Sequence, residues 1–185
     1  PATDWVAGKN NGALDFDGSN DYVDAGANPS LNITGNISVS AWVKPDTVSN
    51  YMRIVSKQYT TSETTANSCF QLGIHDNGLW RWSIGGVFDS TAGTVPTVGQ
   101  WYHFVGTYDM SVAKMYVNGN LIWSGNYTGA IRSASSNPVS IGATYLNGSP
   151  YWLFNGQIDD VRIYNYALSA EQVKQVMNEG AVRFK

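Results

Sequence analysis

The sequence predicts an all-β domain of the sandwich or barrel type, and three observations lead to that class. Apolar residues recur mostly at every second position, which is the period of a strand with one buried face. Turn-forming residues interrupt this pattern often, and no repeat of fixed period is present, which argues against a propeller or solenoid. Charged residues make up only 14% of the chain, against roughly 25% in an average protein, while aromatic residues reach 13%. With 185 residues, the chain is expected to form one domain over 1–185.

The expected strands follow in order along the chain. Two hairpins are predicted, at 69–84 around Asp76-Asn77-Gly78 and at 114–124 around Asn118-Gly119, because both turns are strong hairpin signals. Further strands with alternating or β-branched residues are predicted at 37–43, 52–57, 101–109, 139–143 and 157–164. The segment 11–18 is expected to be an opening strand that pairs with the last strand and closes the domain.

One short helix is predicted near the end of the chain. Ser169 and Gln172 fit a capping box, in which the first and fourth residues bond each other's backbone N–H groups. Val173, Val176 and Met177 then recur at helical spacing. We therefore expect an amphipathic helix that packs on the sandwich.

Charge and composition exclude several classes of protein. The net charge is −3 and no cluster of Lys or Arg is present, so a nucleic-acid partner is not expected. No apolar run reaches the roughly 18 residues of a membrane span, so membrane insertion is not expected. Cys69 is the single cysteine, which rules out a disulfide within the chain and predicts a small buried side chain.

Four stretches in order carry a resemblance to a known family. They are residues 13–23, 37–45, 100–119 and 156–169. Together they resemble the laminin-G-like jelly rolls of the concanavalin A-like lectin/glucanase superfamily. The resemblance implies a two-sheet antiparallel jelly-roll sandwich, often with a bound calcium. It also implies a non-catalytic carbohydrate-binding or adhesion module of a secreted protein.

Aspartates gather at two places that this resemblance brings together. Four of them, Asp15, Asp17, Asp21 and Asp24, lie in and around the opening turn, and two more are adjacent in the closing strand. Calcium binds six to eight oxygens from such groups, and the resemblance implies that a structural Ca²⁺ ties the turn to the strand. The expected side-chain ligands are Asp17, Asn20, Asp21, Asp159 and Asp160. The alternative is that these aspartates only form turns through their own backbone.

Aromatic side chains supply the candidates for sugar binding, because a flat ring covers the apolar face of a sugar. Aromatics inside the family blocks, such as Trp42 and Tyr108, are expected in the core. The remaining candidates lie on one strand and around one loop: Trp80, Trp82, Tyr145, Tyr151 and Trp152. Each is expected either to contact ligand or to pack against the sandwich.

Four polar residues are candidate hydrogen-bonding partners of a sugar: Arg53, Lys57, Gln71 and His75. They lie in strands that should share one sheet, with Arg53 and Lys57 at the same strand parity. The alternative is that they only form the solvated side of that sheet.

The sequence predicts no catalysis. Glycoside hydrolysis needs two carboxyl groups on either side of the bond, and the glutamate-rich strand motif of the glucanase branch is absent. Asp159 and Asp160 are neighbours that should point to opposite faces. Gln71 and His75 leave a lyase-type site as the remaining enzymatic alternative.

The predicted function is therefore a carbohydrate-binding module of an extracellular or cell-surface protein, attached to a polysaccharide-degrading enzyme through neighbouring domains. Its partner would be a polysaccharide or oligosaccharide. A protein-interaction or adhesion module is the alternative, because fold alone does not choose between them.

Overall fold

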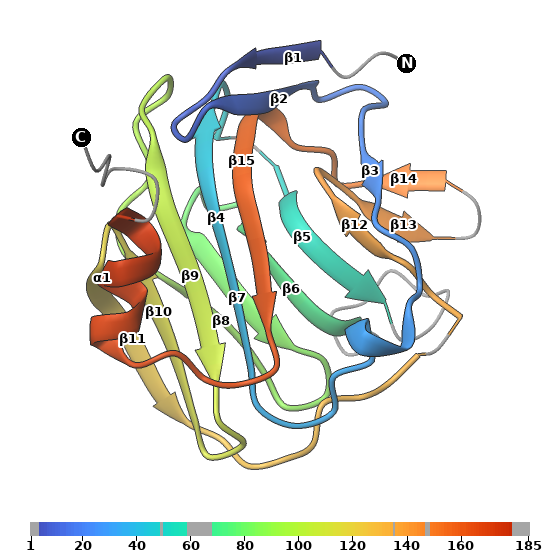
Figure 1. Cartoon of the computed structure of the whole chain (residues 1–185), viewed down its shortest axis with the longest axis vertical. Coiled ribbons are helices and arrows are strands. Elements are labelled where there is room, and N and C mark those ends of the chain that lie inside the picture. Colours follow the sequence, from blue (N-terminus) through green and yellow to red (C-terminus); the bar gives the residue numbers. More distant parts are fainter. Residues whose placement is uncertain (1–3, 49, 59–67, 135, 147–148, 179–185) are drawn as a thin grey trace, which may run out of the picture.

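The computed structural model describes residues 4–48, 50–58, 68–134, 136–146 and 149–178 (Figure 1). Two antiparallel sheets stack face to face. The larger sheet has the order β1-β2-β15-β4-β9-β10-β11 and the smaller one has the order β3-β12-β5-β6-β7-β8. A two-stranded hairpin, β13-β14, lies beside the smaller sheet.

The strands of the larger sheet are β1 (Asp4–Ala7), β2 (Gly12–Asp17), β4 (Ile37–Pro45), β9 (Tyr102–Tyr108), β10 (Val112–Val117), β11 (Asn120–Asn126) and β15 (Asn155–Tyr164). Those of the smaller sheet are β3 (Val23–Asp24), β5 (Met52–Gln58), β6 (Ser68–Ile74), β7 (Trp80–Ile84), β8 (Phe88–Ala92) and β12 (Val139–Ile141). The remaining elements are β13 (Thr144–Leu146), β14 (Ser149–Tyr151), a 3₁₀ turn (Pro29–Leu31) and the helix α1 (Ala170–Asn178).

The predicted closure of the domain is confirmed. Strand β2 pairs antiparallel with β15, with Asp17 opposite Asn155 and Leu14 opposite Ile158. Both predicted hairpins form as well, as β6-β7 and β10-β11. Strands β1, β8, β13 and β14 were not anticipated, because short edge strands carry too few alternating residues to stand out in the sequence.

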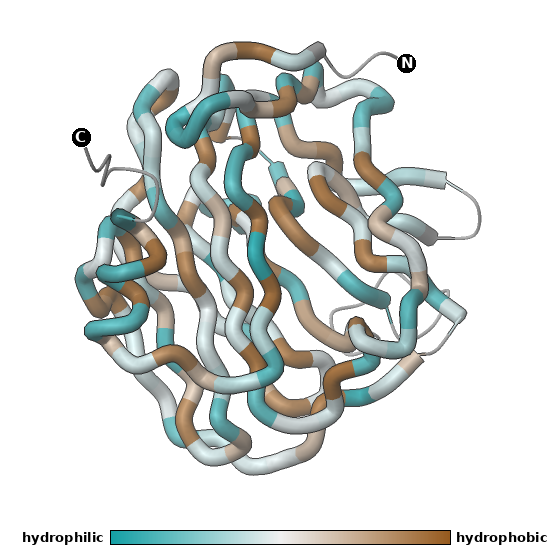
Figure 2. Tube along the Cα trace, viewed as in Figure 1, coloured by the Kyte–Doolittle hydropathy of each residue, from teal (hydrophilic) through white to brown (hydrophobic). Residues whose placement is uncertain are grey.

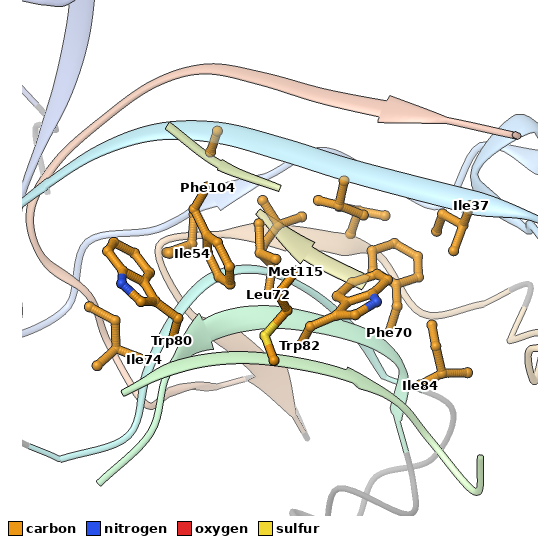
Figure 3. Packing of buried hydrophobic residues seen from close by; sticks show 14 of the residues in the cluster. Ile37, Ile54, Phe70, Leu72, Ile74, Trp80, Trp82, Ile84, Phe104 and Met115 are labelled. Carbon is orange, nitrogen blue, oxygen red and sulfur yellow. The ribbon is translucent and has the colours of Figure 1, made fainter. Parts of the chain in front are cut away.

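The core lies between the two sheets, and it contains both tryptophans of β7 (Figure 3). Trp80 is 2% exposed and its ring lies 4.7 Å from that of Phe104, while Trp82 is fully buried and its Nε1 donates to the Thr107 carbonyl at 3.1 Å. A Cβ on Gly106 would come within 2.4 Å of the Trp82 ring, so only glycine fits opposite it. The expectation that Trp80 and Trp82 contact ligand is therefore wrong.

Hydropathy alternates along several strands (Figure 2), and the apolar members of the alternation lie in the core. A bulge in β5, between Arg53 and Val55, breaks the alternation. Because of it, Arg53 pairs with Gly73 while Lys57 pairs with Phe70, whose side chain lies in the core. Lys57 therefore lies on the opposite side of the sheet from Arg53, and the predicted shared face of these two residues is wrong.

The helix forms as predicted, and it lies against the outer side of the larger sheet (Figure 1). Both bonds of the capping box are present: the Ser169 N–H donates to Gln172 Oε1 at 2.8 Å, and the Gln172 N–H donates to Ser169 Oγ at 3.3 Å. Val173 and Val176 pack with Val105 of β9. None of the helices among the described residues has the length and apolar character of a membrane span.

Cys69 is buried in the core, as its isolation in the sequence predicted. Burial raises the pKa of its thiol to about 11, so the side chain is a neutral thiol at physiological pH and behaves as a small apolar group.

Candidate functional site

The outer face of the smaller sheet carries two rows of polar residues. Strand pairing places Arg53, Gly73, Arg81 and Thr91 in one row across β5, β6, β7 and β8. The neighbouring row contains Ser56, Gln71, Ser83 and Asp89. These residues face away from the core because Leu72, Trp80 and Trp82, which alternate with them, point into it.

This polar face is shielded from solvent. Arg53 and Arg81 are each 1% exposed, and Gln71 is fully buried. Part of the cover comes from the start of β13, where Thr144 Oγ1 donates to Ser56 Oγ at 3.1 Å. Charged and amide side chains are rarely buried to this degree without partners, so their pairing decides what the face can do.

Only some of these groups are paired. Arg81 binds Asp89 in a bidentate way, with Nε donating to Oδ1 at 2.7 Å and Nη2 donating to Oδ2 at 2.9 Å. By contrast, Nε and Nη1 of Arg53 and both amide atoms of Gln71 have no hydrogen-bond partner among the described residues. Their hydrogen-bonding capacity is not used by any described residue, and the atoms themselves are buried.

Three aromatic rings lie at the Arg53 end of the row. The Arg53 guanidinium lies 4.5 Å from the ring centroid of Trp152 and 5.5 Å from that of Tyr51. Tyr51 contacts Trp152 at 5.8 Å and His75 at 4.7 Å, centroid to centroid. His75 is held by a contact of its Nδ1 with the Asp76 carboxylate. The Arg53 guanidinium thus lies against both of these neighbouring rings.

A cavity of about 370 Å³ lies in front of these rings, and its lining includes Tyr51, Trp152, Asn155 and Gly18. Two of the residues that line it, Asn50 and Trp152, have left-handed backbones with φ values of 67° and 51°. Such a conformation costs an aromatic residue roughly 1–3 kcal/mol. The Trp152 backbone is fixed by its carbonyl, which accepts the Arg53 N–H at 2.9 Å. Strained residues gather at ligand sites, which makes this cavity the candidate site.

Burial affects the pKa of the arginine beside the cavity. It lowers the pKa of the Arg53 guanidinium well below its usual value, and the neighbouring Arg81 lowers it further, whereas Asp89 and Tyr51 act in the opposite direction. The site therefore contains a cation whose charge is not balanced by a carboxylate of its own.

The structure brings three of the predicted ligand-binding residues together around Tyr51: Arg53, His75 and Trp152. Gln71 lies in the neighbouring row of the same face. Tyr151 is exposed next to Trp152, and Tyr145 packs on Tyr22 with ring centroids 5.4 Å apart. Lys57 instead donates from Nζ to the Asn137 carbonyl at 2.6 Å, away from the cavity.

Arg81 and Tyr51 were missed as site residues, although the sequence held a signal for Arg81. It lies between two tryptophans in Trp80-Arg81-Trp82. If both tryptophans are core, the residue between them must point to the outer face. Tyr51 precedes β5 in an irregular segment, and such a loop position is the weaker signal by which the sequence could have indicated it.

The five predicted calcium ligands do not meet at one point. Asp17 pairs with Asn155, and Asp159 lies four residues further along β15, a separation of roughly 13 Å at strand spacing. One ion cannot contact both, because Ca²⁺–oxygen distances are about 2.3–2.6 Å. Asp159 Oδ2 instead accepts the Asn10 N–H at 2.7 Å.

Asp160 is also engaged elsewhere, because its Oδ1 accepts from Arg162 Nε at 2.7 Å. Asp17, Asn20 and Asp21 remain close in sequence at the opening turn, where Asp21 Oδ2 accepts the Asp17 N–H at 3.1 Å. In the described part of the chain, no group of three or more His, Cys, Asp or Glu side chains is arranged around a common point that would hold a metal ion.

Comparison with known proteins places the chain in a family. Residues 17–174 match the family model described as the concanavalin A-like lectin/glucanases superfamily. The chain belongs to this superfamily. The two stacked sheets are thus the jelly-roll sandwich of the superfamily, as the four sequence blocks predicted. A search of curated proteins returned no match.

Several solved structures of the superfamily's fold are similar to this chain. Domain 4 of AbnA, an extracellular arabinanase from Geobacillus stearothermophilus solved with arabinotriose, is 21% identical, with a TM-score of 0.73 over 96% of this chain and 82% of that one. The CBM40 domain of a Ruminococcus gnavus sialidase, solved with α2,3-sialyllactose, is 16% identical, with a TM-score of 0.73 over 89% of this chain and 96% of that one. A heptameric pentraxin from Limulus polyphemus is 16% identical, with a TM-score of 0.65 over 89% and 81%.

Proposed function

We propose that this domain is a non-catalytic carbohydrate-binding module of a secreted or cell-surface protein. It would bind an oligosaccharide in the cavity lined by Tyr51 and Trp152. The observation that carries the proposal combines two features: aromatic rings that line a cavity, and a buried arginine against these rings that has two nitrogens without a described hydrogen-bond partner. Sugars need both an apolar surface and hydrogen-bonding groups.

The similar structures support this proposal without deciding it. Two of them, the arabinanase domain and the sialidase CBM40, are described with bound oligosaccharides. A module of this kind would hold a linked enzyme near its polysaccharide and raise the local enzyme concentration.

The competing function, a protein-interaction module, has weaker support on the described surface. The two most exposed large apolar side chains are Trp5 and Leu121, at 77% and 53%. They lie on β1 and β11, the opposite edges of the larger sheet, and do not combine into one patch.

Calcium is a separate proposal, and we restrict it to the opening turn with Asp17, Asn20 and Asp21. The three side chains lie within five residues, and the Asp21 carboxylate is buried to 6% exposure. A cation there would be structural, at a turn whose Gly18 also lines the cavity.

A glycan array followed by titration calorimetry tests the function. Trp152→Ala is expected to weaken binding of any glycan found by at least about tenfold, or about 1.4 kcal/mol. Trp5→Ala is the matched control, because it removes an exposed tryptophan that does not line the cavity. Absence of glycan binding by the folded wild-type domain, or equal affinity of Trp152→Ala and wild type, contradicts the proposal. Release of reducing ends from the bound glycan would contradict the absence of catalysis.

A further inference from the structure

We infer that the ligand of this site is an acidic glycan, in which the carboxylate of a sugar residue contacts the Arg53 guanidinium. The inference rests on the proposed function and deepens it, because it names the class of sugar. It follows from the charges on the outer face of the smaller sheet, from the unfilled hydrogen bonds there and from the size of the cavity.

The charges on this face do not balance. Arg53 and Arg81 are both buried, and both guanidinium groups lie within 6 Å of the Tyr51 ring centroid, at 5.5 and 5.9 Å. The Asp89 carboxylate is engaged on both oxygens by Arg81. Among the described residues, no carboxylate forms an ion pair with Arg53. One positive charge is therefore left over at the end of the face that adjoins the cavity.

An unpaired buried charge is costly, by several kcal/mol even after the protein relaxes. A neutral sugar would need only a hydrogen-bond donor here, and glutamine or asparagine would provide it without that cost. A buried arginine is suited to a carboxylate, because charge-assisted hydrogen bonds are about twice as strong as neutral ones. Nε and Nη1 of Arg53 are the donors that remain for it.

The surroundings of Arg53 suit a sugar rather than a free ion. The cavity of about 370 Å³ is within the range of small-molecule sites and far larger than an inorganic anion needs. The Trp152 and Tyr51 rings supply the apolar surface for the sugar ring. Gln71, whose amide has no described hydrogen-bond partner, lies in the neighbouring row of the same face, two residues along β6 from the Gly73 that pairs with Arg53.

Access to Arg53, which is 1% exposed, requires the Trp152 ring to shift off the guanidinium while it remains at the cavity wall. Trp152 is half-buried and stacks on the guanidinium, and its backbone φ of 51° is unfavourable for an aromatic residue. The ring therefore lies over Arg53 on a segment whose backbone is strained. A carboxylate that replaces the cation–π contact with a charge-assisted bond would favour its displacement.

Titration calorimetry with matched glycan pairs tests the inference. The probes are trigalacturonate and α2,3-sialyllactose, each beside its own methyl ester, which keeps the sugar and removes the charge. At least one acid is expected to bind tenfold or more tightly than its ester, with an affinity that falls as salt concentration rises. Arg53→Gln should remove the preference for the acid, and Lys114→Gln, which neutralises a cation on the other sheet, should leave it unchanged.

The outcomes separate the inference from the proposed function. If neutral glycans or the esters bind as well as the acids, the acidic class is wrong while the carbohydrate-binding function stands. If no glycan of either kind binds, both fail. If sodium acetate or sulfate at equal ionic strength binds as tightly as the acidic glycans, the site holds a free anion and the inference fails. The acid–ester comparison uses the wild-type domain and therefore holds even if Arg53→Gln does not fold.

Discussion

The buried histidine of β9 makes the stability of this domain depend on pH in a calculable way. His103 is 1% exposed, its ring lies 5.2 Å from that of Trp42, and neither ring nitrogen has a hydrogen-bond partner among the described residues. The pKa of this imidazole is lowered from 6.5 to about 4, chiefly by burial, which Asp160 partly opposes and Arg162 reinforces. The neutral form is therefore the one that the fold accepts.

The sign and the size follow from the two pKa values. Above pH 6.5 the imidazole is neutral in both the folded and the unfolded state, so it contributes no pH dependence. As the pH falls below 6.5, the unfolded chain takes up a proton that the folded chain refuses until about pH 4. The free energy of unfolding should therefore fall by about 2 kcal/mol by pH 5, and by about 3 kcal/mol once both states are protonated.

Urea denaturation of the wild type and of His103→Phe at pH 7.5 and pH 5 measures this effect. Phenylalanine keeps the ring but cannot be protonated, so the variant should lose about 2 kcal/mol less than the wild type over the same interval. The difference between the two proteins removes the contribution of other groups, such as Asp109, whose lowered pKa also makes the fold less stable in acid. Equal losses in the two proteins would refute the account of His103.

Two further predictions concern the helix and the opening turn. Ser169→Ala removes the acceptor of the Gln172 N–H and should lower the free energy of unfolding by about 1 kcal/mol, measured by urea denaturation. Ser169→Asp can still accept this bond and should therefore lose clearly less stability. Equal losses in the two variants would exclude the helix cap as the cause. If calcium binds at the opening turn, a chelator should lower the melting temperature and added calcium should restore it, by an amount that grows with the logarithm of free calcium. Asp21→Asn should reduce that response, and a melting temperature that does not respond to either treatment would remove calcium from this domain.

Prediction from sequence succeeded where the signal is local. Alternation along the strands, two tight turns and the spacing of Ser169 and Gln172 are each contained in a few consecutive residues, and the corresponding hairpins and helix form. Pairing of the first and last blocks was also predictable, because the four family blocks occur in order and β2 and β15 are their outermost members.

The candidate site was predictable only in part, because strand parity carries no information about bulges. The bulge between Arg53 and Val55 keeps Arg53 on the outer face and turns Lys57 to the other side. The register between β2 and β15 is likewise not visible in the sequence, and it places Asp17 opposite Asn155 and not beside Asp159.

By itself, then, the sequence determined the fold class, the order of the sheet-forming blocks and the supply of aromatic and polar residues from which a sugar site can be built. The tertiary structure decided which of them form it. Trp80 and Trp82 are indistinguishable from surface aromatics in the sequence, but they are buried because the larger sheet covers that side of β7. Arg53 and Trp152 are almost a hundred residues apart in the chain, and only the packing of β5 against the segment after β14 stacks one on the other. Contacts between distant segments depend on how the sheets close, which no local pattern records.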